Sequence, residues 1–270
     1  MTNRQKNPLL YKIIRTIFYA LFMIVYHPKI VNKVFIPKEG RAVLAGNHKH
    51  ALDPILVDCC TNRTVHTLAK KELHDGSFGW LFRGVGTIPV DLHAAHNPAA
   101  LDQSVAYLRN DCIINVSPEA KRNYTDQVLL PFKYGAVVMA KRAQSSIIPY
   151  AITGEYRFRS RNLQIKYGEP LDVANLTVEE ANTLLYNTIK EMLLQEMNTQ
   201  GNQPVDKADV ATVDEYMEKQ PADKADVDAG EEYTGNQPAD KMDVGTVDRY
   251  TGNQPADKAD VGTVEEGTGE

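Results

Sequence analysis

Cysteine is scarce in this sequence: its 270 residues include three, Cys59, Cys60 and Cys112. An odd number without the spacing of a disulfide framework argues against a disulfide-bonded scaffold and favours a reducing compartment. Cys112 opens an apolar run, where we expect an ordinary buried thiol. Cys59 and Cys60 are expected to pack within a helix.

Long hydrophobic runs are also missing. The uncharged apolar run near the N-terminus covers only residues 16–26, whereas a membrane-spanning helix needs about 20 residues. No small-residue cleavage site follows, as a signal peptide would require. Lys12 and Arg15 lie near the start of the run and aromatic residues are scattered through it. Residues 1–28 therefore predict a membrane-associating helix that lies in one leaflet, with its cations at headgroup level. We expect a peripheral or monotopic protein on the cytoplasmic face of the cell membrane. An ordinary core helix is the alternative.

Acidic residues are few in the first part of the chain and abundant in the last. Residues 1–200 hold 24 Lys and Arg against 17 Asp and Glu, a net charge of +7, and residues 201–270 hold 6 against 18, a net charge of −12. This asymmetry predicts a basic folded part followed by an acidic tail. A basic part of this kind suits phosphates or an anionic lipid surface. The partner that we expect is the membrane surface, with no nucleic acid.

The last part of the chain repeats itself. Pro204, Pro221, Pro238 and Pro255 are spaced by 17 residues, and each opens a copy of "PADKADVGTV" or a variant of it. A solenoid is the alternative that such a period raises. Each copy has too little apolar surface to bury, so residues 200–270 are predicted to be a disordered acidic tail.

Strand-like and helix-like segments alternate over residues 29–199, which we expect to form one domain. Such alternation predicts an α/β fold, with a largely parallel central sheet flanked by helices. Functional residues in such sheets gather beyond the strand ends. The expected strands are residues 42–47, 65–70, 87–92, 112–119, 147–154 and 163–170, and the expected helices are residues 54–61, 98–110, 135–144 and 177–197.

The stretch "NHKHALDPIL", residues 47–56, follows the first of those strands and carries two histidines and an aspartate. Asp53 followed by Pro54 is typical of a helix start, with Asp as the N-cap and Pro at the first helical position. On a regular helix His48 and Asp53 would point about 140° apart. If the helix begins at Asp53, the preceding turn can fold His48 back onto the carboxylate. Asp53 would then orient the imidazole and leave its other nitrogen as a general base.

Four further stretches follow in order: "AKKELHDGSFGWLFRGVGTIPVDL", "VSPEAKRN", "PFKYGAVVMA" and "IIPYA". With the His-x4-Asp pair, they resemble the 1-acylglycerol-3-phosphate acyltransferase family over about residues 30–170. The resemblance implies a glycerolphosphate-acyltransferase-like fold. It also implies transfer of a fatty acyl group from acyl-CoA or acyl carrier protein to the free hydroxyl of lysophosphatidate, forming phosphatidate in phospholipid synthesis. No cofactor, metal or covalent enzyme intermediate is implied. The resemblance implies that His48 takes the proton of the hydroxyl and that Asp53 orients the His48 imidazole.

The family's second block, Gly-x-Ile-x-[Val/Phe]-x-Arg, matches Gly86, Ile88 and Val90, but its arginine position holds Leu92. The resemblance links that arginine to the acceptor phosphate. Its loss therefore bears on which acceptor is used. Gly86 is kept as a substrate-binding candidate.

The third block, Phe-Pro-Glu-Gly-Thr-Arg, falls on residues 117–122, and Pro149 matches the last proline of the pattern. Glu119 and Arg122 match and would hold the acceptor. Ala120 replaces the glycine, which is unfavourable if that position needs a positive φ. Lys121 replaces the threonine and adds a point charge, though without the bidentate fork of arginine. Lys70 and Lys71 are the remaining candidates for phosphate binding, or else an ordinary surface pair.

Three other interpretations remain open. His48, His50, Asp53 and Cys59 vaguely resemble metal ligands, but no second ligand cluster follows downstream. A non-catalytic membrane-surface module of the same fold is the second alternative. The third is an acyltransferase acting on another lysolipid or on an amino-acid-derived lipid. His50 is expected to serve local structure.

Overall fold

A computed structural model describes residues 8–94, 96–159 and 162–199 of the chain. Its centre is a seven-stranded sheet with the order β1-β7-β6-β2-β5-β3-β4. Every neighbouring pair is parallel except β6 and β7, which run antiparallel. The prediction of a largely parallel α/β sheet is therefore confirmed. The strands are β1 (Lys29–Val31), β2 (Ala42–Gly46), β3 (Val65–Lys70), β4 (Ile88–Val90), β5 (Ile113–Val116), β6 (Ser146–Thr153) and β7 (Gln164–Tyr167).

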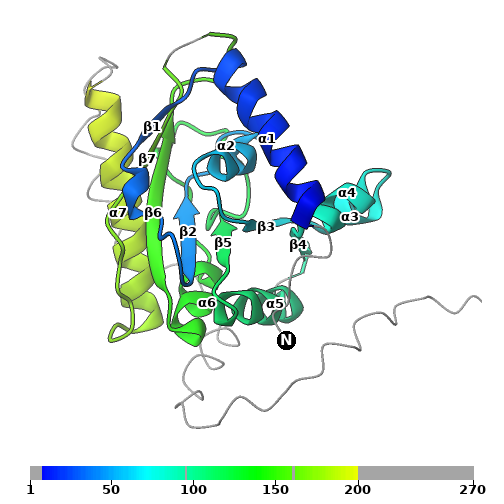
Figure 1. Cartoon of the computed structure of the whole chain (residues 1–270). Helices are drawn as coiled ribbons and strands as arrows, with labels where there is room; N and C mark the ends of the chain where they lie inside the picture. The colour runs from blue at the N-terminus through cyan, green and yellow to red at the C-terminus, as the bar shows by residue number, and fades with distance from the viewer. Residues whose placement is uncertain (1–7, 95, 160–161, 200–270) are drawn as a thin grey trace, which may run out of the picture. The chain divides into compact units, whose positions relative to one another are not determined.

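Helices cover both faces of the sheet (Figure 1). Buried side chains of α5, α6 and α7 pack on one face, and those of α1 and α2 pack on the other. α1 also contacts α4. The helices are α1 (Pro8–Val25), α2 (Asp53–Cys59), α3 (Lys71–Asp75), α4 (Gly79–Val85), α5 (Pro98–Arg109), α6 (Gly135–Ala143) and α7 (Val178–Thr199), with one 3-10 turn at Lys33–Phe35.

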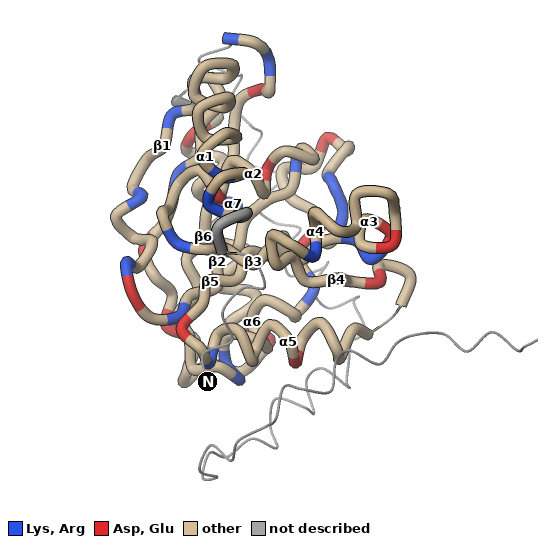
Figure 2. The backbone as a smooth tube through the Cα atoms, turned by 45° about the vertical axis from the view of Figure 1, so that its right-hand side comes forward, with Lys and Arg blue, Asp and Glu red and all other residues tan. Residues whose placement is uncertain are grey.

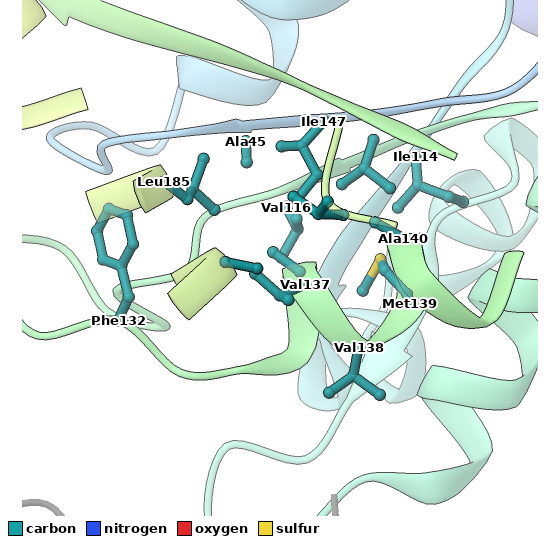
Figure 3. Packing of buried hydrophobic residues seen from close by; sticks show 14 of the residues in the cluster. Ala45, Ile114, Val116, Phe132, Val137, Val138, Met139, Ala140, Ile147 and Leu185 are labelled. Atoms are coloured by element: carbon teal, nitrogen blue, oxygen red, sulfur yellow. The ribbon is translucent and has the colours of Figure 1, made fainter. Parts of the chain in front are cut away.

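Strand β2 lies at the middle of the sheet and is buried along its whole length. Its side chains alternate between the two faces: Val43 and Ala45 join the core under α5, α6 and α7, and Ala42 and Leu44 join the core under α1 and α2. Covering both faces explains why the strand is apolar throughout rather than alternating with polar residues. Figure 3 shows the first of these cores, where residues of α6 pack against Ala45, Ile114 and Ile147 from three neighbouring strands.

Gly46 ends β2 at a point of close approach. It is the register partner of Tyr150 on β6. A Cβ on residue 46 would lie 2.1 Å from the Tyr150 ring and 2.5 Å from the Tyr150 carbonyl oxygen. Glycine is required here because a side chain has no room, and the next residue opens the loop that carries His48.

The expected elements are present, with β4, β5 and β7 about half as long as expected, but the sequence interpretation omitted β1, α3 and α4. These are short: β1 has 3 residues, α3 has 5 and α4 has 7. Periodicity is not visible over so few residues, and the glycines at 76 and 79 interrupt the α3–α4 segment.

The predicted N-terminal helix is present as α1, and it is partly integrated into the domain. Tyr11 and Phe22 are buried, and Tyr11 accepts the Val65 N–H on β3 at 3.1 Å. Within the described residues, no helix combines the length and the apolar character needed to cross a membrane. Residues 1–7 and the repeat segment at 200–270 lie outside the described residues, so disorder of the tail stays a prediction.

Candidate active site

The candidate site lies at the carboxyl ends of β2, β5 and β6, where the loops after parallel strands meet. The loop after β2 begins with Asn47, whose buried side chain continues the sheet. Its Nδ2 donates to the Ile152 carbonyl at 3.0 Å, and its Oδ1 accepts the Ile152 N–H at 2.7 Å. This paired contact fixes the chain to β6 just before His48.

His48 and Asp53 meet in the loop after β2. The His48 Nδ1 lies 3.0 Å from the Asp53 Oδ2. The Asp53 side chain is 1% exposed and that of His48 is 23% exposed, so the carboxylate is buried beneath a ring that solutes can reach. The turn expected from the sequence is therefore formed. The catalytic role of the pair stays a prediction.

The prediction that Asp53 caps the following helix is wrong. α2 begins at Asp53 itself, and its N-cap is Leu52, which makes no side-chain capping hydrogen bond. The Asp53 Oδ2 instead accepts the backbone N–H groups of Lys49 and His50, both at 2.8 Å. The carboxylate is directed backward over the loop because three donors converge on it there, including the imidazole.

This geometry assigns the imidazole tautomer. A carboxylate only accepts hydrogen bonds, so His48 donates from Nδ1, and in the neutral ring Nε2 is the nitrogen that carries the lone pair. Orientation of one ring nitrogen by a buried carboxylate, with the other facing a reachable space, suits general-base catalysis.

Glu119 holds the backbone of His48 in place. This side chain is 4% exposed; its Oε1 accepts the His48 N–H at 2.7 Å and its Oε2 accepts the Leu130 N–H at 2.9 Å. Burial raises the pKa of Glu119, and the two N–H groups oppose that rise. On the other side, the Asn123 N–H donates to the His48 carbonyl at 2.9 Å. The third sequence block and the residue after it thus hold the His48 N–H and carbonyl. Both oxygens of Glu119 are engaged by backbone N–H groups rather than turned toward a ligand.

Ala120 adopts φ +56°. The sequence predicted that alanine is unfavourable here if the position needs a positive φ. The backbone does lie in the left-handed region that glycine favours, so that condition is met. The Ala120 N–H closes the turn on the Ser117 carbonyl at 3.0 Å.

The basic candidates of the third block are exposed next to this turn. Lys121 and Arg122 directly precede Asn123, which binds the His48 carbonyl. The Arg122 guanidinium lies 5.2 Å from the centroid of the Tyr124 ring. Connectivity therefore places the backbone of these two basic residues close to that of His48 in the His48–Asp53 dyad.

The second block lies on β4, the edge strand of the sheet, with β3 between it and β5. Lys70 ends β3 opposite Val90 of β4, and Lys71 begins α3; both lysines are exposed. Leu92, at the position where the family has arginine, follows β4 and is half-buried. In Figure 2 basic positions colour the tube around α3, α4 and β4. Gly86 caps α4 with φ +77°, and its carbonyl lies 2.7 Å from the His66 Nδ1.

His50 serves the local structure: its Nδ1 accepts the Leu52 N–H at 3.2 Å. Cys59 and Cys60 are buried in the core under α1 and α2. Cys112 corrects the expectation of a buried thiol, because it precedes β5 and is only half-buried. Across the part of the chain that the structure describes, no three His, Cys, Asp or Glu side chains are grouped so as to hold a metal ion.

Three residues at the site had no signal in the sequence. Asn47 and Lys49 were within the quoted stretch without an assigned role. Lys49 is partly buried, its Nζ donates to the Gly154 carbonyl, and burial lowers its pKa. Tyr156, beyond the last matching block, donates its hydroxyl to the Asp53 Oδ1 at 2.6 Å. No motif or spacing connects these residues, because the contacts form between separate loops.

The sequence is similar to those of known proteins. A protein-family model described as Acyltransferase matches residues 27–153. The 1-acyl-sn-glycerol-3-phosphate acyltransferase of Bacillus subtilis (strain 168) is 27% identical over 161 residues, which make up 56% of this chain and 79% of that protein. The 1-acyl-sn-glycerol-3-phosphate acyltransferase alpha of Homo sapiens is 28% identical over 178 residues, 61% of this chain and 62% of the human protein. Over residues 27–153 this chain therefore resembles the acyltransferase family, with 1-acyl-sn-glycerol-3-phosphate acyltransferases among its relatives.

The fold of this acyltransferase agrees with that resemblance. The crystal structure of the 1-acyl-sn-glycerophosphate (LPA) acyltransferase PlsC from Thermotoga maritima matches it with a TM-score of 0.55 at 20% identity, covering 68% of this chain and 79% of that one. At this identity the likeness concerns the fold. The chain spans less than two thirds of the length of the human relative. The acceptor and the acyl donor of this chain are therefore proposed rather than assigned.

Proposed function

We propose that this acyltransferase moves a fatty acyl group from an acyl thioester to the free hydroxyl of lysophosphatidate, forming phosphatidate. The observation that carries the proposal is the His48 Nδ1 to Asp53 Oδ2 contact at 3.0 Å, beside the loop that bears Lys121 and Arg122. The donor is an acyl group on coenzyme A or acyl carrier protein, and the reaction needs no cofactor.

In the proposed reaction, the His48 Nε2 removes the proton of the acceptor hydroxyl. The oxygen attacks the thioester carbonyl, a C–O bond forms, and the C–S bond breaks. His48 then returns the proton to the departing thiolate. Asp53 stabilises the imidazolium that exists between the two proton transfers.

The acceptor phosphate would be held by Arg122 and Lys121, with Lys70 or Lys71 as a further partner. Charge-assisted hydrogen bonds from guanidinium and ammonium groups suit a phosphate dianion. Glu119 would act beneath them by fixing the His48 backbone.

Loss of activity in His48→Ala tests the mechanism. We expect turnover of lysophosphatidate and an acyl thioester to fall by about 10²- to 10⁴-fold, the usual contribution of general-base catalysis. His93→Ala is the matched control, since the ring of His93 is 87% exposed. Near-normal turnover by His48→Ala, with the same melting temperature, would contradict the proposed base. Absence of turnover in the wild-type protein would favour the non-catalytic membrane module.

A second acceptor remains a candidate because Leu92 occupies the position of the family's arginine. Without that cation, the site would bind the acceptor phosphate less strongly. A product screen by mass spectrometry, with mixed lysolipids and amino-acid-derived lipids as acceptors, tests it. A phosphate-free acceptor used faster than lysophosphatidate would replace the first proposal with the second.

We also propose that α1 docks on the membrane, at the cytoplasmic face. Four exposed residues, Ile13, Ile17, Leu21 and Ile24, form one stripe of α1, opposite the side that buries Phe22. On α4, which contacts α1, Trp80 is also exposed. An apolar stripe on the helix and an interfacial tryptophan suit insertion at headgroup depth.

The test of docking is the double substitution Ile17→Ser, Ile24→Ser. These side chains are 61% and 65% exposed, so removing them spares the core, whereas deleting the helix would also remove Phe22. We expect co-sedimentation with anionic vesicles to fall severalfold, while Val34→Ser, at an 81% exposed site on the 3-10 turn, leaves it unchanged. Unaltered sedimentation of the double variant would show that α1 is not the anchor.

A further inference from the structure

Tyr156 reaches the catalytic carboxylate from a separate loop. It lies after the end of β6, and its hydroxyl donates to the Asp53 Oδ1 at 2.6 Å. The Oδ2 of the same carboxylate accepts from His48, Lys49 and His50. Tyr156 is thus the partner that the structure gives to the second oxygen of a side chain that is 1% exposed.

The ring of Tyr156 is held by aromatic neighbours. It stacks on the His50 ring, with centroids 4.4 Å apart and planes inclined by 22°. Two rings of the α1 region meet its edge: Tyr26 at 5.6 Å and Phe22 at 6.4 Å between centroids. Contacts on several sides restrict the rotation that would move the hydroxyl away from Asp53.

The hydroxyl remains a donor throughout the working pH range. Burial, together with the nearby Asp53 carboxylate, raises the pKa of Tyr156 well above that of an exposed phenol. Other titratable groups also lie around this centre: they are His48, Lys49, His50, Cys60, Glu119 and Tyr150. Burial raises the pKa values of Cys60 and Tyr150 and keeps these two side chains neutral.

We propose that Tyr156 is a positioning residue for acyl transfer, which acts through Asp53 by fixing the carboxylate that orients His48. The proposal rests on the proposed role of His48 as base. Without the hydroxyl, the buried Oδ1 loses its donor, and a carboxylate with fewer donors attracts a proton more strongly. The His48–Asp53 pair would then hold its proton to a higher pH, and less of the free base would be present near neutrality.

Tyr156→Phe tests the proposal because phenylalanine keeps the ring and its stacking while removing the hydroxyl. We expect kcat to fall about tenfold with little change in KM, and the acidic limb of the pH profile to move up by about one pH unit. Tyr134→Phe, a change at a half-buried tyrosine before α6, is the matched control and should leave both unchanged. An unmoved acidic limb in Tyr156→Phe would overturn the proposal, even if the variant were less stable.

Two further measurements separate this proposal from the proposed function. In the full-length protein, the NMR titration of the His48 ring should move to higher pH in Tyr156→Phe, whichever acceptor lipid is used. A double-mutant cycle with Asp53→Asn should give strongly non-additive losses in kcat, since Tyr156 acts through that carboxylate. Additive losses, or an unchanged His48 titration, would show that Tyr156 does not position the dyad. Absence of lysophosphatidate turnover in the wild-type protein would overturn the proposed function alone.

Discussion

Asp53 organises the candidate site at the scale of single residues. Its carboxylate accepts from the ring of His48, two backbone N–H groups and the hydroxyl of Tyr156. A buried carboxylate is costly unless its hydrogen bonds are satisfied, and here four donors supply them. The same contacts set the direction of His48, so the side chain that is most buried also determines the geometry of the exposed one.

Ala120 is one of the non-glycine residues with a positive φ, and it lies in the third sequence block. At φ +56° an L-residue pays a steric cost that glycine does not. We expect Ala120→Gly to raise the free energy of unfolding by about 1 kcal/mol, measured by urea denaturation. Ala106→Gly, at an exposed position inside α5, should lower it by about the same amount. Destabilisation by Ala120→Gly would show that the turn does not carry this strain.

The acceptor phosphate gives a second prediction for single residues. Arg122→Ala should raise the KM for lysophosphatidate about ten- to a hundredfold, the scale of one charged hydrogen bond. Leu92→Arg should lower it, since it restores a cation where the chain has none. Lys38→Ala removes the same charge just before β2, at the opposite edge of the sheet, and should change little. Unaltered lysophosphatidate kinetics in Arg122→Ala would favour the phosphate-free acceptor.

At the scale of elements, α1 is both a part of the core and a surface. Phe22 packs in the core, and Arg15 ties the helix to α2 by donating from its Nε to the Asp58 carbonyl at 3.1 Å. The stripe through Ile17 and Ile24 is exposed on the opposite side. A helix fixed in this way carries its apolar stripe at a set orientation relative to the rest of the domain.

Asp58, on α2 beneath α1, gives a pH-dependent prediction. Its Oδ1 is buried and has no hydrogen-bond partner in the described part of the chain, and burial raises its pKa to about 8, against a smaller opposing effect of Arg15. Between pH 4 and 8 the folded state therefore holds a proton that the unfolded state has lost. The stability that this group contributes is complete below about pH 4 and is lost as the pH rises from there through about 8. The free energy of unfolding falls by at most about 1.4 kcal/mol per pH unit in this range.

Urea denaturation from pH 5 to pH 8.5 measures this effect. Asp58→Asn keeps the neutral form at every pH, so its free energy of unfolding should fall less with pH than that of the wild type. Asp126→Asn, at an exposed position, should keep the wild-type slope. If the free energy of unfolding changed equally with pH in all three proteins, the Asp58 carboxyl would not be buried in its neutral form.

The sheet places the site at the scale of the whole molecule. β2, β5 and β6 are neighbours and parallel, so the loops that carry His48, Glu119 and Tyr156 leave the sheet at one edge.

The net charge differs between the two parts of the chain: it is +7 over residues 1–200 and −12 over residues 201–270. The acidic segment would weaken attraction of the basic part to an anionic bilayer.

Truncation after residue 200 tests that effect. The formal net charge changes from −5 to +7, so we expect tighter binding to anionic vesicles at low salt, little change on neutral vesicles, and loss of the difference at high salt. The melting temperature should stay within a few degrees, because the clustered core of the described residues extends no further than Leu193. Salt-independent binding, or a large fall in melting temperature, would contradict this prediction.

Much of the fold could be predicted because its signals are local. The apolar run of β2 and the helical period of α7 depend on neighbouring residues, so the sequence alone determined them and the parallel α/β class that their alternation implies. The His-x4-Asp spacing is equally local, and the turn that joins its two side chains was expected. Very short elements such as β1 and α3 carry too few residues for a period to be visible.

Only the tertiary structure decided how separate loops share one carboxylate. Glu119 binds the His48 N–H across 71 residues, and Tyr156 binds Asp53 across 103 residues. These contacts depend on which strands become neighbours and in which register, so no spacing along the chain encodes them. The direction of Asp53 was settled in the same way: its helix start predicted a cap, but the buried donors of His48, Lys49, His50 and Tyr156 outweighed that local preference.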